Sequence, residues 1–100
     1  MNGLICSGGG TAYKVKVGTG LTEVVVNSPA TKFIRITNLG ANAVFLGPAG
    51  GGVAADTGIV LEPYGNPNDF IEFNNNNMFY CDFHAVTKTG TSDVAVLVGR

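Results

Sequence analysis

Short runs in which apolar and polar residues alternate recur along the whole chain. In the clearest of them, Tyr13, Val15 and Val17 alternate with two lysines. Because successive side chains of a β-strand point to opposite sides, this pattern predicts a strand with one buried face and one face in water.

Eight such runs, rich in β-branched and aromatic residues, are separated by Gly, Pro and Asn clusters at the spacing of roughly 8–12 residues that is typical of sandwiches and barrels. No window carries a helical stripe. The sequence therefore predicts an all-β fold of about eight short strands, either an antiparallel β-sandwich or a small β-barrel, jelly-roll or Ig-like. The runs are Ala12–Val17, Leu21–Val26, Lys32–Asn38, Ala43–Leu46, Gly58–Glu62, Asp69–Phe73, Met78–Val86 and Asp93–Val98.

Two runs are apolar on both faces. In the second run, alternation directs Val24 and Val26 to the core and leaves Val25 on the face of Glu23, while the last run places Leu97 opposite its valines. Only 13 of the 100 residues are charged, about half the usual share of a globular protein. We therefore expect a partner to cover part of this surface.

The N-terminal end is rich in glycine and differs from the rest of the chain. Residues 1–11 are predicted to form a flexible arm in which Leu4 and Ile5 make a small hydrophobic anchor, and residues 12–100 are predicted to form a single β-sandwich domain. The arm lacks the positive region and the apolar stretch of an export signal, so we expect no targeting segment.

Net charge and the length of the apolar runs argue against two classes of partner. The net charge of −1 provides no cationic field for nucleic acid, and no apolar run approaches the roughly 20 residues that a membrane helix needs. Cys6 and Cys81 are the only cysteines; synthesis in a reducing cytoplasm is the simplest interpretation, and a single bridge between them stays open.

The side chains that carry most enzyme chemistry are scarce. His84 is the only histidine, and it lies three residues from Cys81 on one strand, so the two side chains point to opposite faces and form no local dyad. Two cysteines and one histidine are too few for a zinc site, and the acidic residues do not show a calcium-loop spacing. We expect no catalytic, metal or cofactor site. A small hydrolase stays open as an alternative if acidic side chains converge on His84.

Sugar binding is a second alternative. Exposed aromatic rings and amide groups suit carbohydrate recognition, and Tyr64, Tyr80 and the Asn74–Asn77 turn provide these residue types. Tryptophan is absent from the chain.

Three segments, taken in order, resemble small virion proteins of tailed bacteriophages. The run from Lys32 to Gly47 contains a strand that ends in a polar Asn-Leu-Gly turn and a second strand that finishes in Leu-Gly. The segments Gly58–Pro63 and Ala85–Val94 are similar to the family's glycine-hydrophobic-proline stretch and final hairpin. The chain departs from the commonest form at Tyr64–Asn68, where an insertion replaces a shorter turn.

This resemblance implies a capsid decoration, or cement, protein that is made in the host cytoplasm and located on the virion. Such a protein binds the major capsid protein on the outer surface of an assembled head, bridges neighbouring capsomers and is often a homotrimer. Related domains occur in head fibres and tails, which stay alternatives. We expect the partner interface to include Leu4, Ile5, Val25, Tyr64 and Leu97.

Overall fold

The computed structural model describes residues 9–74, 76–77 and 81–100, and the described chain is all-β. Eight strands form two antiparallel sheets of four, which confirms the predicted sandwich; the barrel alternative is wrong because the sheets do not close on one another. The strands are β1 (Gly10–Val17), β2 (Thr22–Val25), β3 (Phe33–Asn38), β4 (Val44–Pro48), β5 (Ile59–Leu61), β6 (Phe70–Phe73), β7 (Phe83–Thr87) and β8 (Ser92–Gly99).

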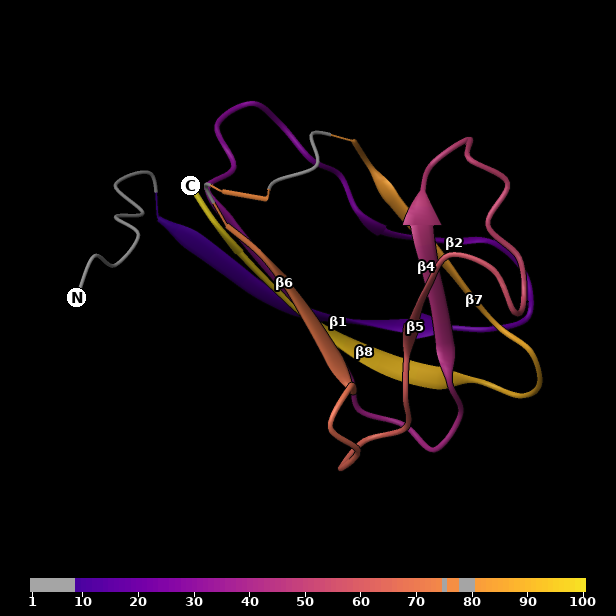
Figure 1. Cartoon of the computed structure of the whole chain (residues 1–100). Helices are drawn as coiled ribbons and strands as arrows, with labels where there is room; N and C mark the ends of the chain where they lie inside the picture. Colours follow the sequence, from indigo (N-terminus) through magenta and orange to yellow (C-terminus); the bar gives the residue numbers. More distant parts are fainter. Residues whose placement is uncertain (1–8, 75, 78–80) are drawn as a thin grey trace.

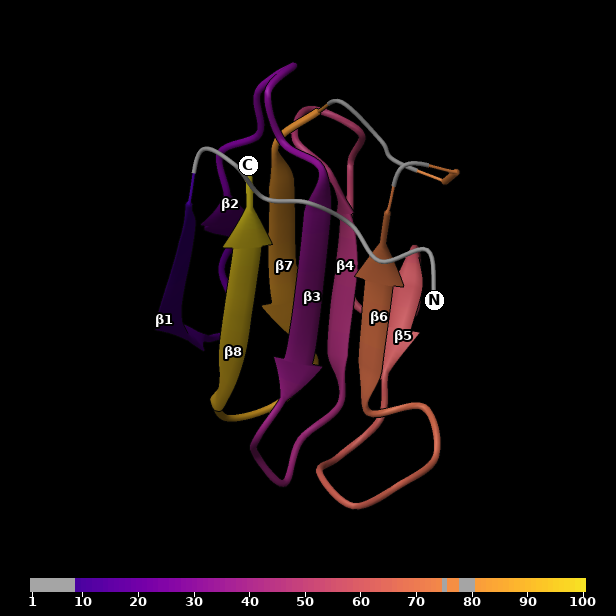
Figure 2. The same ribbon diagram turned by 90° about the vertical axis from the view of Figure 1, so that its left-hand side faces the viewer.

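The chain pairs as one long hairpin that is rolled up. β1 pairs with β8, β2 with β7, β3 with β6 and β4 with β5, all antiparallel. Rolling this hairpin adds the pairs β3 with β8 and β4 with β7, which gives the sheet orders β1-β8-β3-β6 and β2-β7-β4-β5 (Figures 1 and 2). This nested pairing is a jelly roll, and it differs from the Ig-like alternative.

Two strands begin two or more residues away from their predicted start. β1 begins at Gly10 and therefore includes two residues that we had assigned to the flexible arm. β7 begins only at Phe83, so Cys81 and Asp82 of the predicted run lie before the strand. Residues 78–80 of that run lie outside the described residues.

The core lies between the two sheets and is built from the faces that alternation predicts. Ile34 and Ile36 of β3, Phe83 and Ala85 of β7 and the valines of β8 are all buried there. The rings of Phe73 and Phe83 stack at a centroid distance of 5.2 Å and join the first sheet to the second. Aromatic pairs of this kind add to the stabilisation that buried area provides.

The face predicted for Val25 is wrong. The pairing of β2 with β7 shifts register between Glu23 and Val25, so one extra residue enters β2. Because a bulge of this kind reverses the alternation, Val24 and Val25 are both buried while Val26 is exposed. Val25 is 1% exposed and belongs to the core.

A buried asparagine ties the strands together at one end of the sandwich. The Asn38 side-chain NH₂ group donates to the carbonyl oxygens of Asn42, Leu61 and Glu62 at 2.8–3.2 Å. Its carbonyl oxygen accepts from the amide of Gly40 at 3.0 Å and from the hydroxyl of Ser92 at 2.6 Å. A buried amide with these partners satisfies its hydrogen-bonding groups and fixes the relative positions of several segments.

The chain partly covers the outer face of its own second sheet. Phe45 and Val86 point away from the central core on this face, and yet they are 6% and 4% exposed. The loop between β4 and β5 brings Val53 against Gly47, and Asp56 of the same loop forms an ion pair with Lys88 at 3.1 Å. Of the two outer sheet faces, this one is therefore partly shielded from a partner.

Candidate functional site

The outer face of the first sheet has no comparable cover among the described residues (Figure 2). Register aligns its outward side chains in rows, so that Ala12 of β1, Leu97 of β8 and Arg35 of β3 lie side by side, with Glu72 of β6 next in the row. Leu97 is 44% exposed in the middle of this face. The described part of this face thus presents Leu97, an exposed apolar side chain, between small and charged neighbours.

A shallow groove of about 520 Å³ runs across this face. Ala12 of β1 and Ala95 of β8 are small, whereas Lys14, Leu97 and Arg35 contribute longer side chains to the same groove. The groove is lined by Ala12, Tyr13, Lys14, Arg35, Thr37, Ala95, Val96 and Leu97. Its apolar floor and cationic walls suit a partner chain better than a small reactive substrate.

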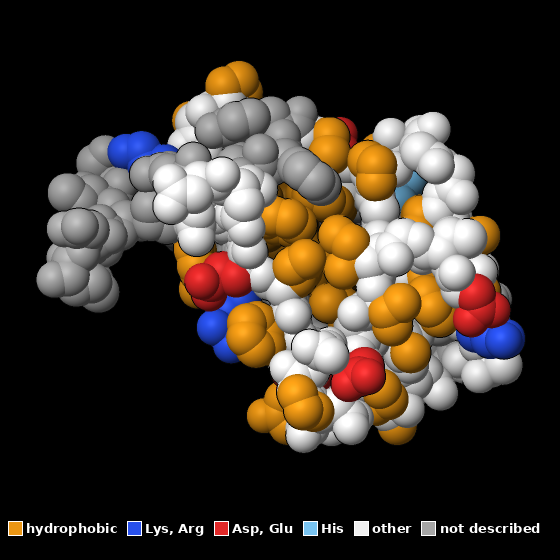
Figure 3. Space-filling view, in the orientation of Figure 1, with side chains coloured by type: hydrophobic (Ala, Val, Ile, Leu, Met, Phe, Trp, Pro, Cys, Tyr) orange, Lys and Arg blue, Asp and Glu red, His pale blue; other side chains and the backbone are white. Residues whose placement is uncertain are grey.

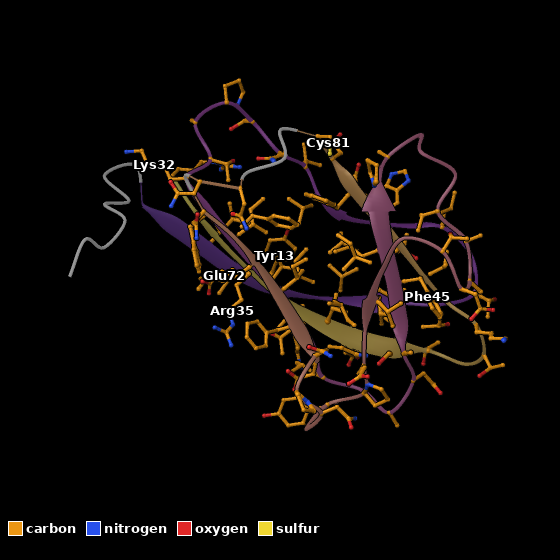
Figure 4. The ribbon with its side chains drawn as sticks, in the orientation of Figure 1. Tyr13, Lys32, Arg35, Phe45, Glu72 and Cys81 are labelled. Atoms are coloured by element: carbon orange, nitrogen blue, oxygen red, sulfur yellow. The ribbon has the colours of Figure 1, made fainter. Side chains whose placement is uncertain are left out.

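Arg35 is held in place over this surface. Its guanidinium carbon lies 4.1 Å from the centroid of the Phe70 ring, and its Nη1 atom lies 3.4 Å from Oε1 of Glu72. Figure 4 shows Arg35 and Glu72 on the side of the first sheet that faces away from the second. Cation–π contact and the carboxylate together orient the guanidinium, which lowers the entropy lost when a partner binds it.

Tyr13 lines the groove from the inner side of β1 and joins the two sheets. Its hydroxyl donates a hydrogen bond to the carbonyl oxygen of Val24 at 2.8 Å. Burial raises the pKa of the Tyr13 phenol above 10.0, Arg100 opposes this shift, and Glu23 adds to it. The hydroxyl is therefore protonated, and able to donate, throughout the neutral range.

We expect the burial of the Tyr13 phenol to make stability fall at alkaline pH. Because the pKa of Tyr13 is raised in the folded chain, its contribution is complete below the unfolded value of about 10 and is lost as pH rises through the folded value. Urea unfolding of the wild type and Tyr13→Phe between about pH 8 and about pH 11 checks this. The wild type loses stability more steeply above about pH 10 than the variant. Parallel curves would contradict a raised pKa for Tyr13 in the folded chain.

Comparison with known proteins identifies no relative. No family model matches the chain, and no curated protein or solved structure shows significant similarity to it. A proposal about function therefore rests on the chain's own surface and on the resemblance of its segments.

The structure places the predicted interface residues in different surroundings. Leu4 and Ile5 lie outside the described residues. Val25 is buried in the core and is not accessible to a partner in this structure. Leu97 lies in the groove, and Tyr64, which is 64% exposed, lies in the loop between β5 and β6 at one end of the sandwich.

The structure places the residues considered for catalysis on β7 and just before it. His84 is half-buried on β7, where its register neighbours are Glu23 and Gly47. No group of three or more His, Cys, Asp and Glu side chains among the described residues could hold a metal ion. Burial, with a smaller effect from Asp82, raises the pKa of the Cys81 thiol and disfavours its thiolate form. The described part of the chain also has no helix that could cross a membrane.

The amides considered for sugar binding are partly engaged within their own turn. The side-chain oxygens of Asn74 and Asn77 accept backbone amides at 2.9 and 2.7 Å, and the Asn77 NH₂ group donates to the carbonyl oxygen of Glu72 at 3.3 Å. Tyr80 lies outside the described residues. Tyr64 is the described aromatic residue of this set that is available to a ligand.

Sequence reasoning missed Arg35 and Phe70 as members of the surface. Both residues occur in predicted strands, but their contact depends on the pairing of β3 with β6, which joins segments more than 30 positions apart. Figure 3 shows further apolar side chains gathered between β6 and β5, with charged groups toward the margins. The low charge of the sequence was the signal for such surfaces, although it did not locate them.

Proposed function

We propose that this chain is a structural virion protein that binds the outer surface of an assembled phage capsid and stabilises it by bridging neighbouring capsomers. The observation that carries the proposal is the apolar groove on the first sheet, over which no described residue packs, beside a second sheet whose outer face the chain partly covers itself. The resemblance of the segments within residues 32–94 supplies the capsid as partner. The jelly roll agrees with this role, since many viral capsid domains share it, although a fold alone does not define a function.

In this proposal the major capsid protein contacts the groove around Leu97, and copies of the chain associate as a homotrimer on the capsid surface. A multivalent arrangement strengthens binding, because each further contact becomes intramolecular after the first. The small size of one groove is then no obstacle to stable decoration of a head.

Substitution of Leu97 tests this function. Leu97→Asp places a charge in the groove, and we expect it to weaken binding to purified heads of the phage that encodes the chain by about tenfold or more, as loss of a central apolar contact does. Co-sedimentation of protein with heads measures the affinity. Val60→Asp is the matched control, because Val60 is 46% exposed against 44% for Leu97 but lies on the second sheet. Equal effects of the two substitutions, or no binding of the wild type, would contradict the proposal.

The trimer is tested separately. Sedimentation velocity at micromolar concentration is expected to show a species of three chains. A monomer under these conditions would contradict the homotrimer in solution.

Carbohydrate binding is the second candidate, since lectin domains also use the jelly roll and Tyr64 is exposed. A glycan array followed by sugar titration distinguishes the two functions. If neither measurement detects binding, carbohydrate binding is excluded as the function.

A further inference from the structure

β1 forms a free edge of the first sheet. This strand of eight residues pairs with β8 on one side, and no described strand pairs with it on the other, so it lies at the margin of the sheet in Figure 2. Long edge strands expose unpaired backbone groups that can accept a strand from another chain.

The register shows which backbone groups of β1 are free. The Arg100 amide donates to the carbonyl oxygen of Gly9 at 2.9 Å, which extends the β1–β8 ladder by one pair. In an antiparallel ladder the bonded residues alternate, so odd-numbered residues of β1 bond to β8. The N–H and C=O groups of Gly10, Ala12, Lys14 and Lys16 therefore point away from the sheet.

The other side of β8 confirms this alternation. The Leu39 amide donates to the carbonyl oxygen of Asp93 at 2.8 Å, so odd-numbered residues of β8 bond toward β3. Even-numbered residues of β8 are then left to bond β1, which agrees with the bond made by Arg100. Two independent bonds thus give the same set of free edge groups on β1.

The outer face of this free edge carries two lysines, of which Lys16 lies opposite Asp93 of β8 in the register and Lys14 lies opposite Ala95. Lys14 and Lys16 lie two residues apart on the outer face, about 7 Å from one another along the strand, and neither forms an ion pair with a described residue. A second copy of β1 that paired about Lys14 or Val15 would set lysine directly opposite lysine, which is unfavourable. Acidic side chains placed opposite Lys14 and Lys16 would instead be favourable, so an acidic strand fits this edge better than a second β1 in those two registers.

The inner face of the same edge is apolar. Tyr13 is 36% exposed and Val15 is half-buried against the core, although both side chains point toward the second sheet. A strand added beside β1 would bring alternate side chains next to these two residues. Apolar side chains at those positions would gain burial, while the positions between them would face the lysines.

We propose that β1 is the docking edge for an extended segment of another protein in which acidic residues alternate with apolar ones. The segment joins the first sheet as a fifth strand, its backbone bonds to the free groups of Gly10, Ala12, Lys14 and Lys16, and its carboxylates face Lys14 and Lys16. The inference goes beyond capsid binding and does not depend on it, because it concerns the chemistry of the segment and not the particle that carries it.

Charge exchange tests the proposal with a defined probe. A short, fluorescently labelled peptide that alternates glutamate with valine is titrated against the full chain, and a peptide with lysine in place of glutamate is the control. We expect the wild type to bind the glutamate peptide about tenfold more tightly, and the double variant Lys14→Glu, Lys16→Glu to prefer the lysine peptide. Equal binding of the two peptides to the wild type, or an unchanged preference in the double variant, would overturn the proposal.

A proline substitution tests the backbone bonds. Lys14→Pro removes a free edge donor without removing a bond to β8, and proline is tolerated on an edge strand. Lys14→Thr is the matched control, since it removes the same charge and keeps the amide. We expect Lys14→Pro to bind the glutamate peptide about tenfold more weakly than Lys14→Thr, and equal affinities would show that no strand is added. If the proline variant does not fold, the charge exchange still decides the proposal. Because Lys14 also lines the groove, the Leu97→Asp variant, which leaves both lysines in place, tests the binding of heads separately.

Discussion

Asn38→Ala lowers the free energy of unfolding by about 3 kcal/mol or more, because it leaves buried polar groups without partners. The Gly40 amide and the Ser92 hydroxyl lose their acceptor, and the carbonyl oxygens of Leu61 and Glu62 lose a donor. Each unsatisfied buried group costs about 1–3 kcal/mol, and alanine also leaves a small void. Urea unfolding followed by circular dichroism measures the loss, with an unchanged slope if the unfolded state is unaffected.

Asn66→Ala is the control for this prediction. Asn66 also donates a side-chain hydrogen bond, to the carbonyl oxygen of Pro63 at 2.7 Å, but it lies in an exposed turn where water replaces the lost partner. We expect a loss of about 1 kcal/mol or less. If the two substitutions cost the same, the network around Asn38 does not hold the end of the sandwich together.

Phe83→Ala lowers the free energy of unfolding by about 3–5 kcal/mol, the usual cost of removing a fully buried aromatic side chain. Phe83 is 0% exposed, and its ring stacks on Phe73 from the opposite sheet. The substitution removes apolar burial, opens a cavity and breaks a contact that joins the sheets. The same urea titration detects it as a lower midpoint.

Phe70→Ala separates burial from aromatic character. Phe70 is 40% exposed on the outer face, where its ring contacts the Arg35 guanidinium. Its loss is expected to cost about 1 kcal/mol, since an exposed cation–π contact contributes about 0.5–1 kcal/mol. A loss as large as that of Phe83→Ala would mean that the outer face, rather than the space between the sheets, is the main core.

The strands were predictable from the sequence because each one is a local pattern. Alternation separates the buried side chains of the last strand, Val94, Val96 and Val98, from Leu97, and Gly, Pro and Asn clusters mark the turns between strands. It failed at Val25, since a bulge changes the face of a side chain without changing the residue types around it. The core face of a strand is thus readable only where its register is regular.

The pairing of strands was not predictable, because it joins distant segments. Gly10 faces Gly99 across the first sheet, and no local pattern near either residue specifies the other. The candidate surface depends on that pairing: Arg35 reaches Phe70 and Glu72 only because β3 lies beside β6. Alternation placed Leu97 on the face opposite the valines of its strand, whereas the groove around it required the topology.

The two outer faces of the sandwich differ from one another. The loop between β4 and β5 shields the second sheet with Val53, while the first sheet presents Leu97, Phe70 and an oriented Arg35 to solvent. A chain that binds a shell through one face and presents the other to solvent needs this difference. The arrangement accounts for low surface charge without requiring a reactive centre.

An electron cryomicroscopy reconstruction of the phage head carrying this chain tests the proposed role most directly. We predict copies of the jelly roll on the outer surface of the head, with Leu97 and Arg35 buried against the capsid or a neighbouring copy and the second sheet's loop in solvent. A head without the chain, or copies whose first sheet faces solvent, would contradict the account.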